Sequence, residues 1–372
     1  MTDNSKKIES AHAHRKDEHL SLVIWQWRHI LPYSGLQFVR LDRPVLPNIR
    51  TDQVDHSVDL FGRHFDWPFY IEAMTGGSLR TGVINQKLAA IAKKYHLAMA
   101  VGSESIAISE KEAVSSFSVV RETNPEGFIF ANIGAGHSLD DAKEAVKIVD
   151  ANALEIHINA VQELSMNEGD RDFRAWKNNI AKIIEQIQVP VIIKEVGFGM
   201  SKSAIKDLAD LHPAAINIAG AGGTDFGRIE EARNRESLWE TADQNNFASD
   251  EDKKEAIETE DDLDFQSVLT SNTNLGISTS ESLRFAKQAN TALPIIANGG
   301  ITNSLEVFNA MALGAKMAGI AGYFLFQLSK NNLEHTIESW QKQLPLLYAI
   351  YGATNSFQIS QLKEIDPYDS LN

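Results

Sequence analysis

The sequence predicts an α/β protein whose core is a (β/α)8 TIM barrel, with an N-terminal extension and an acidic insertion between strands six and seven. Eight short apolar segments rich in β-branched residues recur along the chain, as buried parallel strands require. Helical periodicity occupies several intervals between them, for example 85–95, 140–149 and 304–313. Eight such units favour a barrel, and a doubly wound sheet is the structural alternative.

The predicted strands follow one another at the spacing of repeated strand–loop–helix units. They cover 69–75, 97–102, 128–134, 153–159, 189–196, 214–220, 294–300 and 317–323. The interval from 220 to 294 is longer than the others and contains the run 248–264, in which nine acidic residues outnumber two lysines. Such a run is typical of a solvated or mobile excursion, and the alternative is a lid above the barrel.

We expect three regions along the chain. An N-terminal extension covers 1–65, the barrel covers 66–350 with its excursion at 225–280, and a C-terminal tail covers 351–372. The extension contains a charged cluster from Arg15 to His19. By itself, such a cluster is typical of a solvated N-terminal segment.

Composition excludes several classes of protein. The chain of 372 residues carries a formal net charge of −15, which argues against binding to nucleic acid or to an anionic membrane surface. It contains no cysteine, so disulfides, thiolate catalysis and cysteine-ligated metals are excluded. The N-terminus lacks the apolar region of a signal peptide, and the apolar stretches are too short to span a membrane. We therefore expect a soluble, cytoplasmic protein.

A cluster of polar side chains follows the fourth predicted strand. The apolar pattern of 153–159 ends with His157 and Asn159, and Gln162 and Glu163 come directly after it. The carboxyl ends of barrel strands are where substrates bind in this architecture. The cluster therefore indicates a site for a polar substrate and a metal, whereas a loop that is polar by chance is the alternative.

Glycines at the ends of strands seven and eight indicate a phosphate site. Strand seven ends with Gly299 and Gly300, and strand eight ends with Ala321 and Gly322. The loops after these two strands commonly bind phosphate in barrels, because glycine lets backbone amides approach it and a helix N-terminus favours its charge. A cofactor anchored by phosphate is expected here.

Small, hydroxyl and amide groups with one lysine end the other strands and would suit a flavin ring over the barrel mouth. They are Ala73, Met74, Thr75, Ser103, Asn132, Lys194 and Thr224. A cation at the pyrimidine edge would stabilise an anionic reduced flavin. Lys194 is the candidate, and an ordinary strand-end lysine or a Schiff-base lysine are the alternatives.

The chain closely resembles the type 2 isopentenyl-diphosphate isomerases, which are FMN-dependent barrel enzymes. The similar segments keep the family's order and span about 15 to 325; they begin with the cluster at 15–19. The others are 73–77, 101–103, 157–163, 194–201, 220–224, 298–301 and 312–315. The N-terminal cluster combined with the strand-four cluster is the specific part, since many FMN barrels share the glycine motifs.

The resemblance implies the interconversion of isopentenyl and dimethylallyl diphosphate with reduced FMN and Mg²⁺, and NAD(P)H as the flavin's reductant. It assigns Glu163 to the metal and places Gln162 at the reacting carbons, where a neutral amide assists the reduced flavin. His157 and Asn159 match residues near the diphosphate, and Arg15 and Lys16 match the pair that binds it, as guanidinium and ammonium groups suit phosphate. The flavin ring positions and the two glycine loops match FMN contacts. Apolar patches and the external arm predict a homo-oligomer.

The chain departs from the family pattern at several positions. Glu104 and Ser105 stand where Gln-Arg is usual, which removes a cation expected near the diphosphate. Asn217 replaces a usual Asp, Phe226 stands where Trp or Phe occurs, and Thr302 replaces an Arg. These changes affect expected affinity and rate more than reaction type.

Two other functions compete with the isomerase. An FMN-dependent 2-hydroxy-acid oxidoreductase shares the barrel and the glycine loops but needs a histidine near strand seven and arginines for a carboxylate. Residues 265–303 contain no histidine, and Arg284 is their only arginine. The other alternative is a catalytically silent flavin-binding barrel, against which the Gln162–Glu163 pair argues.

Overall fold

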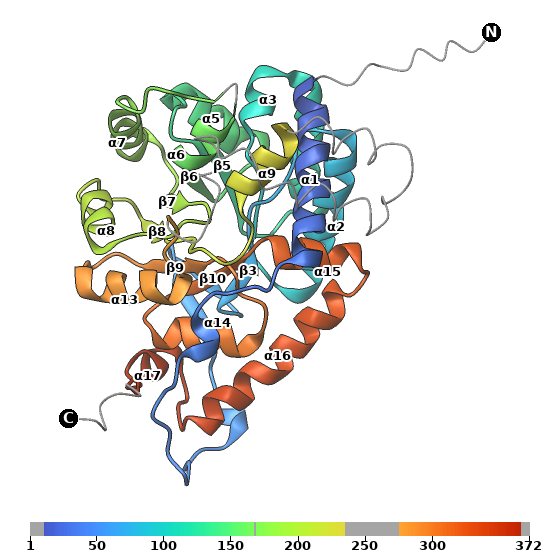
Figure 1. Cartoon of the computed structure of the whole chain (residues 1–372). Coiled ribbons are helices and arrows are strands. Elements are labelled where there is room, and N and C mark those ends of the chain that lie inside the picture. Colours follow the sequence, from blue (N-terminus) through green and yellow to red (C-terminus); the bar gives the residue numbers. More distant parts are fainter. Residues whose placement is uncertain (1–10, 167–168, 235–274, 366–372) are drawn as a thin grey trace, which may run out of the picture.

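The structure is a computed structural model that describes residues 11–166, 169–234 and 275–365. Its centre is a closed barrel of eight parallel strands in the order β10-β3-β4-β5-β6-β7-β8-β9 (Figure 1). The strands are β3 (Phe69–Ile71), β4 (Met99–Ala100), β5 (Ile129–Gly134), β6 (Ala153–Ile158), β7 (Val191–Glu195), β8 (Ala215–Asn217), β9 (Ile295–Asn298) and β10 (Met317–Ile320). Each lies within a predicted strand. The barrel prediction is confirmed, and the doubly wound alternative is wrong.

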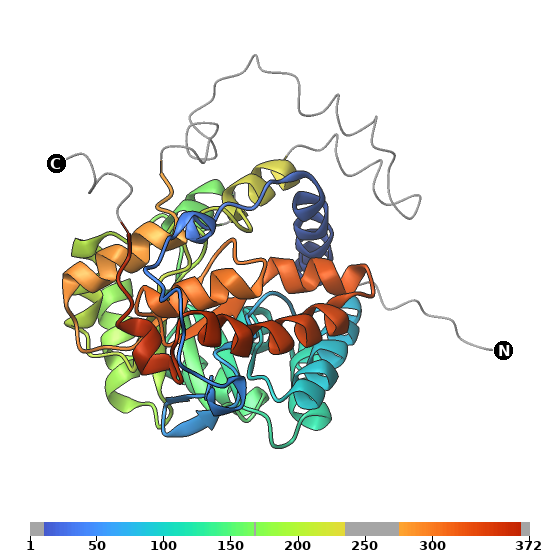
Figure 2. The ribbon, with the colours of Figure 1, turned by 90° about the horizontal axis from the view of Figure 1, so that it is seen from below.

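Helices alternate with the strands as the periodicity predicts. They are α2 (Leu79–Tyr95), α3 (Ser105–Ser109), α4 (Ser115–Thr123), α5 (Leu139–Ile148), α6 (Ala160–Ser165), α7 (Trp176–Gln186), α8 (Lys202–Ala209), α9 (Phe226–Asn234), α13 (Thr279–Ala289), α14 (Ser304–Ala312), α15 (Gly322–Ser329), α16 (Leu333–Ile350) and α17 (Ser356–Ser360), with 3-10 turns η1 (Leu36–Phe38), η2 (Thr51–Gln53) and η3 (Lys111–Ala113). Ser78, Ser138 and Ser201 cap α2, α5 and α8 by accepting first-turn amides. Figure 2 shows α16 along the outside of the barrel, where it packs on α14 and α15.

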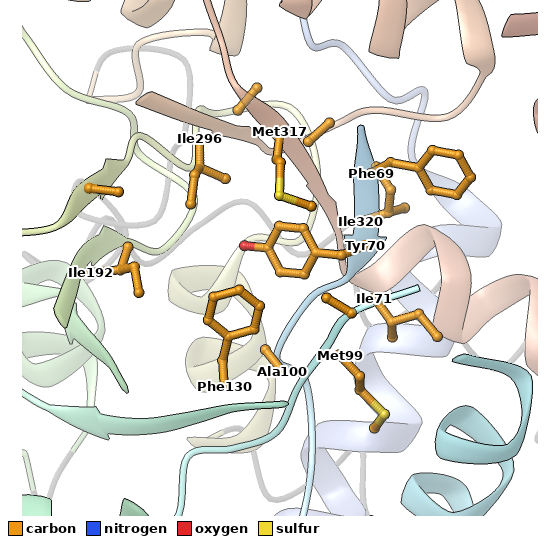
Figure 3. Close-up of a cluster of buried hydrophobic side chains, with 14 of the residues drawn as sticks. Phe69, Tyr70, Ile71, Met99, Ala100, Phe130, Ile192, Ile296, Met317 and Ile320 are labelled. Carbon is orange, nitrogen blue, oxygen red and sulfur yellow. The ribbon is translucent and has the colours of Figure 1, made fainter. Parts of the chain in front are cut away.

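The lower part of the barrel is filled by apolar side chains. Tyr70, Phe130, Ile296 and Met317 point towards one another in Figure 3, and all four are completely buried. The rings of Tyr70 and Phe130 stack with centroids 5.2 Å apart. This packing closes the interior as a solid core, so that ligands have access only from the ends of the strands.

Parallel register aligns the ends of four neighbouring strands, three of which carry a polar side chain at this level. Gly134 pairs with His157, His157 with Lys194, and Lys194 with Asn217. One row of the barrel therefore carries an imidazole, an ammonium and an amide side by side. The sequence predicts each strand end separately, and the register brings them to one level.

The N-terminal extension folds against the barrel. Helix α1 (Ala11–His29) packs on α15 and α9 through an apolar cluster that contains Leu20, Val23 and Ile229 (Figure 1). The chain then forms the hairpin β1 (Val58–Leu60) and β2 (Arg63–Phe65) before entering β3. Among the described helices, none is long and apolar enough to cross a membrane. The acidic run 248–264 lies outside the described residues, so neither interpretation of it is tested.

Candidate active site

Two adjoining cavities open at the carboxyl ends of the strands. The larger has a volume of about 290 Å³. Both cavities are lined by the same five residues, which form a common wall: Ala73, Met74, Lys194, Val196 and Phe226. Most predicted site residues divide between them. Thr224, Gly299, Gly300, Ala321 and Gly322 line the smaller cavity. Arg15, Lys16, Thr75, Ser103, Asn132, His157, Gln162 and Glu163 line the larger one.

The smaller cavity fits the phosphate end of a flavin nucleotide. Gly299 has φ +101°, and a Cβ there would lie 2.0 Å from the carbonyl oxygen of Gly220, so only glycine brings the two loops together. Helix α15 begins at Gly322 without a side-chain cap from Ala321, which leaves its first-turn amides suited to an anion. Trp27 of α1 donates a hydrogen bond from Nε1 to Thr224 Oγ1 at 2.9 Å, which ties the extension to this cavity.

Lys194 is held from below by two buried carboxylates. Its Nζ lies 2.8 Å from Glu72 Oε1 and 3.5 Å from Glu155 Oε2, and all three side chains are almost completely buried. Burial, together with the neighbouring Glu72, raises the pKa of Glu155 to about 8. Burial also acts on Glu72, but Lys194 and hydrogen bonds outweigh it and lower the pKa of that carboxyl. The cluster is therefore one ammonium, one carboxylate and one protonated carboxyl near neutral pH, and Lys194 stays charged at the common wall.

His157 is oriented by Asn132. Asn132 Nδ2 donates to Glu155 Oε2 at 3.0 Å, so its Oδ1 faces His157 Nδ1 at 2.9 Å. The proton of a neutral His157 therefore lies on Nδ1, and Nε2 is an acceptor. Burial and the cation of Lys194 lower the pKa of His157 to about 3. The sequence predicts a donor to a diphosphate at this residue. His157 can donate from Nε2 only when it takes a second proton, which the negative charge of a bound diphosphate would favour.

Helix α1 brings two cations to the larger cavity. Arg15 and Lys16 both line it, although nothing in their sequence distinguishes them from a solvated charge run. Burial, and then the charge of Arg15, lower the pKa of Lys16 to about 8. Two adjacent, half-buried cations that line one cavity favour an anionic ligand there.

Gln162 has a fixed amide orientation. Its Oε1 accepts from Asn159 Nδ2 at 3.2 Å, and its Nε2 donates to Glu230 Oε1 at 3.1 Å. Asn159 itself is buried, caps α6 by accepting from the backbone amide of Gln162, and lines neither cavity. Glu230 is fully buried on α9, and His19 Nε2 lies 3.0 Å from the same carboxylate oxygen. The amide plane of Gln162 is thus set from both ends.

Glu163 presents a half-buried carboxylate to the larger cavity. Its Oε2 accepts from the backbone amide of Asp170 at 2.8 Å. Burial raises its pKa, a cost that a bound cation would offset. Among the described residues no group of three or more His, Cys, Asp or Glu could hold a metal alone. This donor set fits a Mg²⁺ ion bound by one carboxylate and completed by ligand oxygens and water.

The departures from the family pattern have local partners. The buried Glu104 accepts from the backbone amide of Asn132 at 2.9 Å, and Asn217 donates to Glu72 at 2.7 Å. Thr302 donates from its backbone amide to Glu306 at 2.7 Å. Phe226 forms part of the common wall. Three buried carboxylates of the site were not predicted from the sequence. Glu72 and Glu155 had a signal, because each is a glutamate within or directly after an apolar strand pattern. Glu230 had none, since nothing in the sequence places it beside Gln162.

Comparison with known proteins identifies the family. The model of the FMN-dependent dehydrogenase family matches residues 141–364. The isopentenyl-diphosphate delta-isomerase of Lactococcus lactis is 43% identical over 373 residues, which cover 99% of this chain and 97% of that protein. The chain belongs to the isopentenyl-diphosphate delta-isomerases. The namesakes from Limosilactobacillus reuteri and Listeria monocytogenes are 42% and 36% identical, covering 98% and 94% of this chain and 97% and 89% of those proteins.

Solved structures share the fold at much lower identity. A mandelate oxidase variant with benzaldehyde has a TM-score of 0.59 at 11% identity, covering 95% of this chain and 98% of that one. A flavocytochrome b2 variant with benzoylformate also has a TM-score of 0.59, at 17% identity, covering 94% of this chain and 78% of that one. These likenesses bear on the barrel alone. They agree with the closed eight-stranded sheet.

Proposed function

We propose that this protein interconverts isopentenyl and dimethylallyl diphosphate, with reduced FMN as cofactor and Mg²⁺ as metal. The observation that carries the proposal is the common wall of the two cavities. A flavin ring over that wall and a substrate in the larger cavity would share Met74, Lys194 and Phe226. Family membership and the arrangement of Gln162 and Glu163 support the same conclusion.

The residues of the smaller cavity would hold FMN. Gly299, Gly300 and the start of α15 would receive its phosphate, and Lys194 would lie at its ring. When bound, reduced FMN supplies the acid–base or electronic participation that a double-bond shift without net redox change requires. Lys194, kept charged by Glu72, would stabilise negative charge on the ring.

The larger cavity would hold the substrate with its diphosphate towards the cations. Arg15 and Lys16 would bind phosphate oxygens, and Glu163 would hold Mg²⁺ against the same group. Gln162 would face the reacting carbons, oriented by Asn159 and Glu230. Its role is to position and to assist, since a neutral amide is a poor acid. His157 would contact the diphosphate side of the cavity.

The oxidoreductase alternative needs an arginine near strand seven, and among the described residues 275–303 no arginine lines either cavity. Arg284, the only arginine in 275–303, donates to Ser280 at 3.3 Å and forms an ion pair with Glu364. It lines neither cavity. As the sequence predicts, we also propose NAD(P)H as the reductant of the flavin, a cytoplasmic location and a homo-oligomeric state.

The test is an anaerobic incubation of the FMN-loaded, reduced protein with isopentenyl diphosphate and Mg²⁺. Dimethylallyl diphosphate should form with reduced FMN and not with oxidised FMN. Glu163→Gln should lower Mg²⁺-dependent turnover while FMN stays bound. Glu144→Gln, at an exposed carboxylate on α5 that pairs with Lys147, is the matched control. Bound FMN without product in the unaltered protein would support the silent barrel instead.

A further inference from the structure

A hydrogen-bonded chain of four side chains leads from the protein surface to the larger cavity. Ser105 Oγ lies 2.7 Å from Ser103 Oγ and 2.8 Å from His137 Nε2, and His137 Nδ1 lies 3.3 Å from Asp141 Oδ2. Ser103 and Ser105 line the cavity, whereas His137 and Asp141 stand behind them.

The two ends of this chain are held by backbone structure. Asp141 is the third residue of α5, and its carboxylate accepts from the amide and hydroxyl of the capping Ser138 at 2.9 Å each. At the other end, the residue before Ser105 is locked by reciprocal bonds: the Glu104 amide donates to the Asn132 carbonyl, and the Asn132 amide donates to Glu104 Oε2. The Ser105–His137 contact therefore joins two fixed loops.

The chain has the direction that an anion requires. When both ring nitrogens of His137 carry a proton, Nδ1 donates to Asp141 Oδ2 and Nε2 donates to Ser105 Oγ. The Ser105 hydroxyl proton is left to point towards the cavity or Ser103. Lys16 lies close to this wall. Gly77 stands between the two: a Cβ added to it would lie 3.2 Å from Lys16 Cγ and 2.6 Å from Cγ2 of Ile106, the residue after Ser105.

We propose that Ser105 is a phosphate-binding residue and His137 its positioning residue, so that a doubly protonated imidazole backed by Asp141 turns the Ser105 hydroxyl towards the substrate diphosphate. The inference rests on the proposed function, because it takes the diphosphate end of the substrate as the ligand. A proton relay towards the flavin is the competing role of the same four side chains.

The experiment measures the Kd of inorganic pyrophosphate with Mg²⁺ by titration calorimetry on the FMN-loaded protein, and KM and kcat for isopentenyl diphosphate. His137→Ala should raise Kd and KM about tenfold or more, the range for a lost hydrogen bond to a charged group, with kcat and FMN content unchanged. His137→Gln keeps a hydrogen-bond donor, so its Kd and KM should lie between those of the unaltered protein and those of His137→Ala. Ser105→Arg in the His137→Ala background should restore affinity by returning a cation to the wall.

His64→Ala is the matched control, since His64 also pairs with an aspartate, Asp59. This pair lies in the β1–β2 hairpin, which packs through Phe65 on Phe128, the residue before β5. An unchanged pyrophosphate Kd in His137→Ala overturns the inference. A lower kcat with unchanged Kd also overturns it, in favour of the proton relay. If the unaltered protein binds pyrophosphate but forms no dimethylallyl diphosphate, the proposed function fails while the anion site stands.

Discussion

Replacement by glutamine should strongly lower the stability of the folded protein at Glu72 and change it little at Glu155, although both side chains surround Lys194. Glu72 accepts on Oε1 from Lys194 and the Ala73 amide, and on Oε2 from Tyr70 and Asn217 at 2.7 Å each. In Glu72→Gln, the NH₂ group of the glutamine would face two hydrogen-bond donors in either orientation of the amide. The substitution also removes the negative charge that pairs with Lys194. Breaking a buried pair in this way costs about 3–5 kcal/mol, a large part of the stability of a typical protein.

Glu155→Gln should be tolerated, because its carboxyl already holds a proton near neutral pH. A glutamine oxygen can accept from Asn132 and Lys194 as Oε2 does, and its NH₂ can donate to the Tyr70 hydroxyl, which lies 3.3 Å from Oε1. We expect a loss within about 1 kcal/mol at pH 6 to 7.

The pH dependence has a defined sign. The folded protein holds the proton of Glu155 with a pKa of about 8, against 4.5 for an ordinary glutamate, with burial as the main cause. This group's contribution to stability is complete below pH 4.5 and is lost as the pH rises to about 8. At about 1.4 kcal/mol per pKa unit, the loss is roughly 4–5 kcal/mol. Glu155→Gln lacks this term, so its stability relative to the unaltered protein should rise across that window.

Urea unfolding of both variants, followed by circular dichroism at pH 5 to 8.5, measures these differences. Glu144→Gln on the exposed face of α5 is the control and should change stability by no more than about 0.5 kcal/mol. The reasoning is refuted if Glu155→Gln is as destabilising as Glu72→Gln at pH 6. It is also refuted if the difference between Glu155→Gln and the unaltered protein does not change with pH.

Three further predictions concern the two cavities. Glu230→Ala should lower kcat by about 10²-fold with FMN retained, because Gln162 loses one of the groups that fix its amide; a full kcat would remove Glu230 from this role. Gly299→Ala should abolish FMN binding, measured by absorbance after gel filtration. Its control is Gly314→Ala, which should keep FMN because Gly314 has a similar φ of +103° but open space around an added Cβ. Equal loss of FMN in both variants would point to backbone strain alone. Lys16 is charged below its pKa of about 8, so kcat/KM should fall up to tenfold per pH unit above 8, and Lys16→Arg should remove this limb.

Much of the site could be predicted because its residues follow strand ends. Gly299, Gly300, Ala321 and Gly322 come after strands seven and eight, and the carboxyl ends of a barrel's strands must meet at one face. The same reasoning places His157 and Lys194 at that face, and the parallel register then pairs them. Local pattern and the geometry of the barrel are enough for such residues, since each strand carries its functional group at a fixed offset.

The remaining features depend on contacts between elements far apart in the chain. Arg15 and Lys16 belong to a charge run that alone predicts a solvated segment. They reach the cavity because α1 packs on α9 and α15 through Leu20 and Val23, and the spacing of four and seven residues places Lys16 on the same face as these two. Glu230 meets Gln162 across the packing of α9 on α6.

The sequence by itself determined the eight-stranded barrel, the glycine loops and the polar strand ends, because strand period, helix period and glycine content are local properties. The ionisation of the core depends on the tertiary structure, which buries Glu72, Glu155 and Lys194 together, so that Lys194 and Glu72 are charged and Glu155 holds a proton near neutral pH. It likewise set the orientation of Gln162 and the hydrogen bond between Ser105 and His137. The pKa of a group and the direction of a side-chain amide depend on neighbours in space, and no local pattern in the chain encodes them.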